Sequence, residues 1–171
     1  MLGLPSRRIK VCCLFDSIPR FDEMCSYDKH KFVYKECNRL YPRVPIIGRN
    51  ISEEISICGY RIPKVTQVVV SPFLVHRDED VFPDSEKFDP ERFLPENSSH
   101  IPDCAYIPFA AGPRDCIGRV FAEMEVKILV CHILRNFSLH SLDSRDQVLP
   151  IIKITLQLSQ PARIKFRRRQ Q

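Results

Sequence analysis

Prolines limit the fold of this chain more than any other feature of its sequence. Fourteen of the 171 residues are proline, and ten of these lie between Pro42 and Pro113. Proline fixes φ and has no N–H to donate, so it interrupts helices and central strands. Long helices therefore cannot dominate the middle of the chain, and an all-helical bundle is excluded. Apolar residues make up 44% of the sequence, which is enough for a core, and the length predicts one compact domain.

The positive charge of the chain is confined to its C-terminal end. The net charge is +5, and five basic residues follow Pro161 without an acidic one among them: Arg163, Lys165, Arg167, Arg168 and Arg169. Such a run is typical of a solvated terminus. Nucleic-acid binding would need a second basic face. The sequence shows none, so we expect no nucleic-acid partner.

The eight cysteines lack the spacing of a structural zinc site, because no CxxC pair occurs. A disulfide framework would be expected only in a secreted chain. No N-terminal apolar run is long enough for a signal peptide or for a membrane span of about 20 residues. We therefore expect reduced thiols and, for this chain by itself, no membrane anchor and a cytoplasmic location.

Two segments predict the principal helices of the folded part. Residues 1–27 show no sustained period and are expected to form an irregular arm. From Asp28 to Leu40 apolar residues recur at helical spacing, Asp28 is placed to act as the N-cap, and Pro42 ends the run. Residues 117–137 carry a broad apolar face and predict the longest helix.

Strands and a long loop are predicted around these helices. Runs rich in β-branched residues predict one small antiparallel β-sheet from segments around Ile46, Ile55–Ile57, Tyr60–Ile62 and Gln67–Val70. Residues 76–115 show neither the alternation of a strand nor the spacing of a helix. We expect them to form an ordered meander that is held by aromatic side chains: Phe82, Phe88, Phe93, Tyr106 and Phe109. Residues 148–158 and a segment from Ile164 are expected to be strands. The predicted fold class is mainly α with a small β-sheet.

The segment FAAGPRDCIG ends at Gly118, where the longest predicted helix begins. Cys116 would lie at the helix N-terminus, where backbone N–H groups and the helix dipole stabilise a metal-ligating thiolate. Gly112 and Gly118 would allow unusual backbone angles and close approach of a flat macrocycle. Arg114 could pair with a carboxylate on its edge, and Phe109 would shield the sulfur from water. Taken alone, Cys116 could also be a small buried hydrophobic residue.

The spacing of Phe109, Gly112, Arg114, Cys116 and Gly118 resembles the haem-ligating signature of cytochromes P450. This resemblance implies that Cys116 is the axial thiolate ligand of the iron in haem b, and that the other four residues contact the cofactor. It also implies that the fold is the C-terminal portion of the P450 fold, within residues 28–171.

Three further segments resemble P450 motifs in the correct chain order. KECNRLYP looks like the ExxR pair, with Glu36 and Arg39 one helical turn apart. PERF supplies Arg92, which the resemblance makes the third member of a buried triad that holds the meander behind the haem. PIIGR is similar to the segment in which an arginine, here Arg49, meets a haem propionate. Two residues of the HRD run are also typical of the family and are expected to serve as scaffold: His76 and Arg77.

From about Phe32 onward the chain looks most like animal family-4 P450s, a group associated with fatty-acid hydroxylation. The resemblance implies NADPH- and O2-dependent hydroxylation of an apolar substrate such as a fatty acid, with electrons from NADPH-cytochrome P450 reductase. It implies the cytosolic face of the endoplasmic reticulum membrane as the location of complete relatives. The segments Pro45–Gly48 and Leu149–Ile152 would line the substrate pocket.

The resemblance covers only the C-terminal part of a P450. Complete members are far longer, and they carry the membrane anchor, the substrate roof and the helix that delivers protons to dioxygen in the part that comes first. We therefore expect the isolated chain to be inactive. The alternative is a non-catalytic partial P450 that binds haem weakly or not at all and exposes apolar faces. Two positions depart from the family pattern, since Asn38 replaces an apolar residue and Val65 replaces a glycine.

Overall fold

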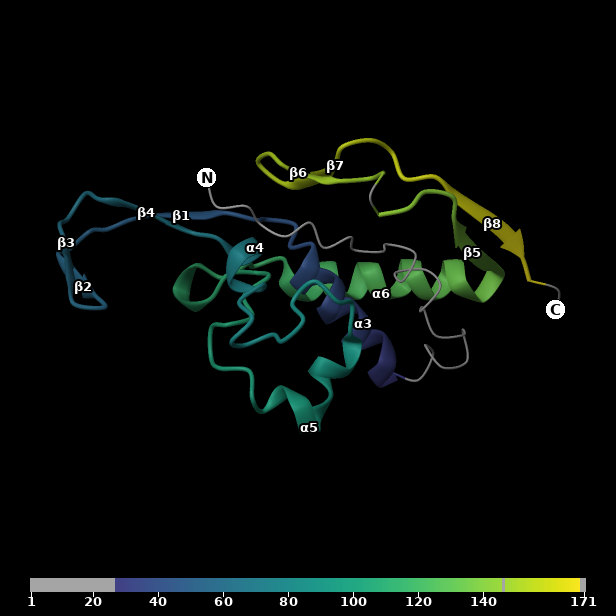
Figure 1. Ribbon diagram of the computed structural model, residues 1–171, viewed down its shortest axis with the longest axis horizontal. Helices are drawn as coiled ribbons and strands as arrows, with labels where there is room; N and C mark the ends of the chain where they lie inside the picture. The colour runs from purple at the N-terminus through teal and green to yellow at the C-terminus, as the bar shows by residue number, and fades with distance from the viewer. Residues whose placement is uncertain (1–26, 146, 170–171) are drawn as a thin grey trace.

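The computed structural model describes residues 27–145 and 147–169, and Figure 1 shows their arrangement. Two long helices lie in the middle of the molecule, α3 (Tyr27–Leu40) and α6 (Arg119–Asn136). An extended hairpin projects to one side of these helices, and the C-terminal strands appear above α6 in the view of Figure 1. The predicted irregular arm, residues 1–27, falls outside the described part except for its last residue.

Helix α3 begins one residue earlier than the sequence predicted. Asp28 lies within the helix and is not its N-cap, because the backbone is already helical at Tyr27. The other end agrees with the prediction, since Leu40 is the last helical residue. Pro42 is buried directly afterwards, and a proline disfavours helical conformation in the residue before it.

The four strands predicted before the meander form two ladders and not one sheet. β1 (Ile47–Asn50) pairs antiparallel with β4 (Gln67–Val70), and β2 (Ile55–Ile57) pairs antiparallel with β3 (Tyr60–Ile62). The ladders follow one another along a single long hairpin, as Figure 1 shows. The prediction of one sheet is corrected in this respect, because the chain turns back at the tip and β2 and β3 never lie beside β1 and β4.

Positive φ angles mark two turns of this hairpin. Cys58 and Gly59 have φ values of 49° and 82°, and positive φ at both central residues is typical of a tight two-residue hairpin turn. Val65 has a φ of 69°, a region that β-branched residues avoid. Its N–H donates to the carbonyl of Ile51 over 2.7 Å, so the pairing of β1 with β4 starts from this strained residue. The glycine that the family pattern implies here would relieve the strain.

The chain between β4 and α6, which includes the meander, consists of irregular segments and short helical turns. The turns in the described residues after β4 are α4 (Pro72–Val75), η1 (Pro90–Phe93), α5 (Pro95–Ser98) and η2 (Gly112–Arg114). Each has a proline at its first or second position, where the missing N–H costs no hydrogen bond. Of the five aromatic residues expected to hold the meander, Phe82 and Phe93 are buried, whereas Phe88, Tyr106 and Phe109 are half-buried. Tyr106 donates its hydroxyl hydrogen to the carbonyl of Lys35 in α3 over 2.9 Å, which fixes the meander to that helix.

The C-terminal part contains more strands than the sequence predicted. They are β5 (Phe137–Ser141), β6 (Pro150–Ile152), β7 (Leu156–Leu158) and β8 (Ile164–Arg168). Helix α6 starts at Arg119 and not at Ile117, and Phe137, which we assigned to it, begins β5 instead. The predicted single strand over residues 148–158 is the β6–β7 hairpin. Phe137 fits the apolar pattern of a helix as well as that of a strand, so the sequence did not reveal the boundary between α6 and β5.

The buried side chains of the described part are both apolar and ionic. The apolar ones are Leu40, Phe82, Phe93, Leu134 and Leu156, and the fully buried polar ones include Glu36, Arg39 and His76. Buried charges are tolerated only when they are paired and hydrogen-bonded. The combination of helices with small antiparallel ladders agrees with the predicted fold class. None of the helices in the described residues has the length and apolarity that a bilayer span requires.

Candidate functional site

The residues from Phe109 to Gly118 form a loop that ends at the N-terminus of α6. The N–H of Cys116 donates to the carbonyl of Phe109 over 2.9 Å. The N–H of Arg119, the first residue of α6, donates to the carbonyl of Cys116 over 3.2 Å. These two bonds hold the cysteine backbone between the turn at Phe109 and the first turn of the helix. Cys116 therefore lies at the positive end of the α6 dipole.

Cys116 is an exposed, free thiol. Its neighbour Ile117 is also fully exposed, so this side of the loop is open to solvent. The expected shielding of Cys116 by Phe109 is not seen, because one half-buried ring cannot cover a residue on an open surface. Cys37 in α3 is different: burial raises the pKa of its thiol to about 12, so this thiol is protonated at neutral pH.

The two glycines of the loop serve different purposes. Gly112 has a φ of +77°, so any side chain at this position would be strained. Gly118 has a φ of −85° and a ψ of 4°, which other residues adopt, so the unusual backbone angle predicted for it is wrong. A Cβ at Gly118 would lie 3.8 Å from the Sγ of Cys116. The absence of a side chain at Gly118 therefore keeps the space beside the sulfur free.

The two arginines predicted to meet carboxylates lie on separate elements. Arg114 is exposed in η2 and has no hydrogen-bond partner among the described residues. Arg49 is half-buried in β1, where its Nη1–H donates to the carbonyl of Gly48 over 2.9 Å. Within the described part, no hydrogen bond or ion pair joins Arg49 to the loop that carries Cys116. Both guanidinium groups keep donors free for an anionic ligand.

Glu36 and Arg39 form a fully buried ion pair at the end of α3. The Nε and Nη2 of Arg39 donate to the two carboxylate oxygens over 2.7 and 2.8 Å. Arg92 of η1 approaches the same carboxylate, with its Nε 3.7 Å from Oε1, and Oε1 accepts the N–H of Asp89 over 2.9 Å. The structure thus brings the three predicted triad residues together and connects α3 to the meander. Their support of a haem site stays a prediction.

His76 is a connecting residue whose partners the sequence did not reveal. It is fully buried, its carbonyl accepts the Nη1–H of Arg39 over 2.8 Å, and its Nε2 accepts the N–H of Ile107 over 2.8 Å. Burial lowers the pKa of His76 to about 4, so the ring is neutral and carries its proton on Nδ1. The partner of the ring is a backbone N–H, and a backbone group leaves no mark in the sequence.

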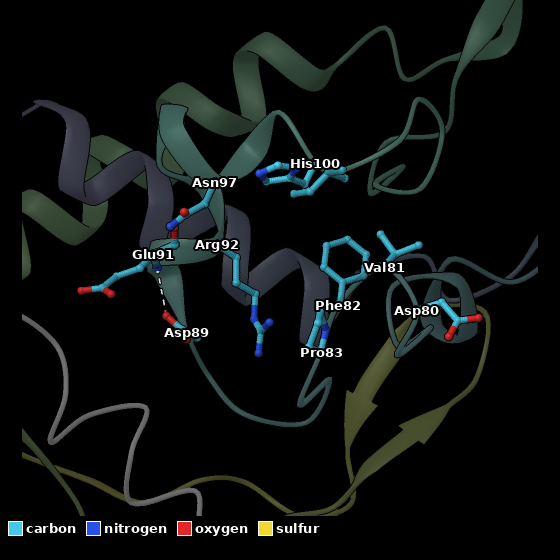
Figure 2. Close-up of a pocket in the computed structure, with 10 residues that line it drawn as sticks. Asp80, Val81, Phe82, Pro83, Asp89, Glu91, Arg92, Asn97 and His100 are labelled. Atoms are coloured by element: carbon cyan, nitrogen blue, oxygen red, sulfur yellow. Dashed lines mark hydrogen bonds between the residues drawn. The ribbon is translucent and has the colours of Figure 1, made fainter.

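A cleft of about 410 Å³ opens in the meander beside Arg92. Figure 2 shows the Arg92 guanidinium between Asp89 and Pro83, with His100 further along the wall. The Nη2 of Arg92 donates to the carbonyl of Asp84 over 3.0 Å. None of the residues predicted to bind a cofactor lines this cleft, so it belongs to the scaffold around the triad.

Comparison with known proteins decides the family. A family model described as Cytochrome P450 matches residues 30–166, well over half of the chain. The chain belongs to the cytochrome P450 family. The resemblance drawn from the motifs is thereby confirmed, and family membership implies a haem held by a cysteine thiolate.

Relatives place this P450 chain near family 4. It is 44% identical over 137 residues to cytochrome P450 4V2 of Rattus norvegicus, which covers 80% of the chain and 26% of that protein. It is 37% identical over 166 residues to cytochrome P450 4c3 of Drosophila melanogaster, which covers 97% of the chain and 27% of that protein. The P450 chain therefore spans about a quarter of the length of these relatives.

A solved P450 structure has the same fold over most of the chain. The structure of retinoic acid-bound cyanobacterial CYP120A1 matches with a TM-score of 0.76 and 29% sequence identity. The match covers 86% of this P450 chain and 33% of that protein. The predicted fold, the C-terminal portion of a P450, is thereby confirmed.

The loop before α6 fits a haem group in its donor chemistry. It presents one exposed sulfur, leaves space beside that sulfur at Gly118, and carries Arg114 without a partner among the described residues. A porphyrin supplies four nitrogen ligands and two carboxylates, so it needs one protein ligand on this face and cations at its edge. The P450 loop offers both.

Proposed function

We propose that this P450 chain forms the thiolate side of a haem-thiolate monooxygenase, in which Cys116 would supply the thiolate that ligates the iron of haem b. The single observation that carries the proposal is the exposed Cys116 thiol, held by two backbone hydrogen bonds at the N-terminus of α6 in a chain of the P450 family. The helix dipole and the unpaired N–H groups of the first turn favour a thiolate at this position.

The remaining residues of the site hold and orient the group. Arg114 and Arg49 would pair with its propionates, because guanidinium groups are suited to bind carboxylates. Gly112 shapes the loop through its positive φ, Gly118 leaves room beside the sulfur, and the carbonyl of Phe109 fixes the Cys116 backbone. When bound, haem supplies an iron centre for dioxygen reduction, and a thiolate ligand favours cleavage of the O–O bond.

The proposed reaction is the hydroxylation of an apolar substrate such as a fatty acid. One oxygen atom of O2 enters a C–H bond of the substrate, and the other leaves as water with two protons. NADPH supplies the two electrons through NADPH-cytochrome P450 reductase. Similarity to family-4 P450s supports this substrate class, as do the exposed isoleucines Ile46, Ile151 and Ile152. The complete protein would act at the cytosolic face of the endoplasmic reticulum membrane.

A second candidate is a non-catalytic partial P450 with weak or no haem binding. One face of α6 favours this alternative, because Val120, Phe121 and Ile128 are each more than 60% exposed. Helices that are apolar on this scale normally pack against other parts of a protein. Without a covered distal side, ligation at Cys116 would leave the iron open to water, and oxygen activation would fail.

Haem reconstitution separates the two candidates. The purified chain is mixed with haem, reduced and exposed to carbon monoxide, and the Soret band is compared between wild type, Cys116→Ser and the control Cys104→Ser, which changes another exposed cysteine. A strongly red-shifted band that only Cys116→Ser abolishes supports thiolate ligation. Absence of haem uptake by the wild type supports the non-catalytic candidate.

A second variant addresses the propionate partner. We expect Arg114→Ala to weaken haem retention without changing the position of the Soret band, because the arginine contacts the edge of the group and not the iron. The control is Arg61→Ala, which removes an exposed arginine of β3. A shifted band in Arg114→Ala would contradict the assigned role.

A further inference from the structure

A second carboxylate between two arginines lies outside the motifs of the site. The Oε1 of Glu86 accepts from the Nε of Arg77 over 2.7 Å, and its Oε2 accepts from the Nη2 of Arg145 over 2.8 Å. The side chains of the two arginines are only 11% and 13% exposed. We call these three residues the Glu86 clamp. Charge-assisted hydrogen bonds of this kind are stronger than neutral ones and specify geometry.

One side of the Glu86 clamp holds the end of α3. The Nη2 of Arg77 donates to the carbonyl of Leu40, the last residue of α3, over 2.7 Å. The Nη1 of Arg77 donates to the carbonyl of Phe73 over 3.2 Å, and its guanidinium lies 3.8 Å from the centre of the Phe73 ring. The Arg77 guanidinium therefore uses all three of its nitrogens, and its position relative to α3 and α4 is fixed.

The other side of the clamp holds the chain that leads into the β6–β7 hairpin. Arg145 lies between β5 and β6, and its Nη1 donates a second hydrogen bond to the carbonyl of Glu86 over 3.2 Å. Its guanidinium also lies 5.6 Å from the centre of the Tyr41 ring, just after α3. Further along, the N–H of Leu156 in β7 donates to the carbonyl of Arg43 over 2.9 Å, and Leu156 is buried.

Two short segments that carry exposed apolar side chains are held together by these contacts. One is the chain between α3 and β1, with Ile46 at 45% exposure, and the other is β6, with Ile151 and Ile152 at 41% and 46%. The segments are far apart in sequence, and the hydrogen bonds that join them in the described residues run through Arg43 and Leu156 and through the Glu86 clamp. The placement of β6 relative to Ile46 therefore depends on Arg145.

We propose that Glu86 and Arg145 are positioning residues that set the β6–β7 hairpin against the segment after α3 and thereby define the spacing of the apolar surface that receives the substrate. The assignment of this surface to substrate rests on the proposed function, whereas the positioning of the hairpin does not. Glu86 would act through Arg145 and the hairpin, without touching the haem or the reacting atoms.

Amide hydrogen exchange tests the positioning directly, with or without haem. In Arg145→Ala we expect the Leu156 amide to exchange roughly tenfold faster, since opening of the hairpin from Arg43 no longer costs the two hydrogen bonds to Glu86. Arg145→Lys keeps the charge but not both donors, so its rate should fall between the two. The control Arg135→Ala removes an exposed arginine of α6 that pairs with no carboxylate among the described residues, and it should match the wild type.

The amides of Arg39 and Leu40 serve as an internal reference in the same experiment. If they keep their wild-type exchange rates in Arg145→Ala, the effect on Leu156 is local and supports the clamp as a positioning device. Unchanged exchange at Leu156, or equal acceleration at both places, would overturn the proposal.

Binding of lauric acid tests the connection to substrate. We expect Glu86→Gln to raise the apparent Kd of the chain for lauric acid several-fold while the carbon monoxide Soret band keeps its position. The control Glu96→Gln changes an exposed carboxylate in the first turn of α5 and should leave this Kd unchanged. An unchanged Kd in Glu86→Gln would overturn the connection to substrate. A wild type that binds neither haem nor fatty acid would count against the proposed function, and the exchange rates would still decide the clamp.

Discussion

The side chain of Arg39 is fully buried, and all three of its guanidinium nitrogens donate hydrogen bonds. Besides the two bonds to Glu36, its Nη1 donates to the carbonyl of His76 over 2.8 Å and its Nη2 to the carbonyl of Lys87 over 3.2 Å. Burying two charges is expensive, and the mutual attraction compensates only when the geometry is good and the remaining donors are satisfied. The bonds to His76 and Lys87 reach two separate points of the meander, so Arg39 fixes where the meander crosses α3.

Removal of the Arg39 side chain should strongly destabilise the fold. Arg39→Ala leaves the Glu36 carboxylate buried with Arg92 at 3.7 Å and the N–H of Asp89 as its remaining partners, and removing one partner of a buried pair costs about 3–5 kcal/mol. Urea unfolding followed by circular dichroism measures the loss. The matched control is Arg61→Ala, because Arg61 and Glu54 form a pair at 2.8 Å that is mostly exposed and should contribute at most about 1 kcal/mol. Equal losses in both variants would contradict the role assigned to burial.

Val65 has a positive φ, which its β-branched side chain disfavours. Its φ of 69° suits glycine, and its side chain is 80% exposed, so it contributes no packing in return. We expect Val65→Gly to raise the free energy of unfolding by about 0.5–1 kcal/mol, because relief of the strained φ exceeds the entropy that a glycine adds to the unfolded chain. Thermal unfolding measures the difference. The neighbouring change Val69→Gly, in a strand with ordinary φ, should destabilise instead.

At the scale of elements, α6 leaves many apolar side chains exposed to solvent. Five apolar side chains along one side of it are between 54% and 71% exposed: Val120, Phe121, Met124, Ile128 and Leu129. Leu134, near the C-terminal end of the same helix, is buried. An apolar helix face of this size is normally covered by other parts of a protein, and the chain spans only about a quarter of the length of its relatives.

Replacing two exposed residues of α6 should reduce self-association without weakening the fold. In the double variant Phe121→Ser with Ile128→Ser we expect a larger monomer fraction by light scattering, because the exposed apolar area shrinks. The free energy of unfolding should stay within about 0.5 kcal/mol of the wild type, as for other exposed substitutions. Leu134→Ser, at a buried position of the same helix, should instead cost about 2–5 kcal/mol. A loss of stability in the double variant would mean that this face is covered.

At the scale of the whole molecule, acid should weaken the fold through buried histidines. Burial lowers the pKa of His76 from its ordinary value of 6.5 to about 4, and it lowers that of His30 as well. Below pH 6.5 the unfolded chain therefore binds protons that the folded chain does not, and stability falls as the pH drops toward 4. For His76 the loss between pH 7.5 and 4.5 is on the order of 2–3 kcal/mol.

The contribution of His76 can be separated from that of the carboxylates by a variant that does not titrate. In His76→Gln the amide oxygen can accept the N–H of Ile107 in place of the ring nitrogen, so the fold should persist with a smaller difference between urea unfolding at pH 7.5 and at pH 4.5. His100→Gln, at an exposed histidine, should keep the wild-type difference. An unchanged pH dependence in His76→Gln would show that the ring is not the group responsible.

Much of the local structure followed from neighbouring residues alone. Pro42 predicted the end of α3, β-branched runs separated by Gly59 predicted β2 and β3, and the spacing around Cys116 indicated the family and the loop before α6. These features are readable because helix ends, tight turns and motif spacing depend on the φ preferences and hydrogen-bonding groups of residues that are adjacent in the chain.

Tertiary structure alone decided which of these residues are buried and which partners they meet. A Glu and an Arg one turn apart look the same in sequence whether they are exposed to solvent or, like Glu36 and Arg39, fully buried. The bonds of His76 to Ile107 and of Arg145 to Glu86 join segments whose separation leaves no periodic signal. Burial and long-range pairing depend on what the rest of the chain places opposite a side chain, and no local pattern carries that information.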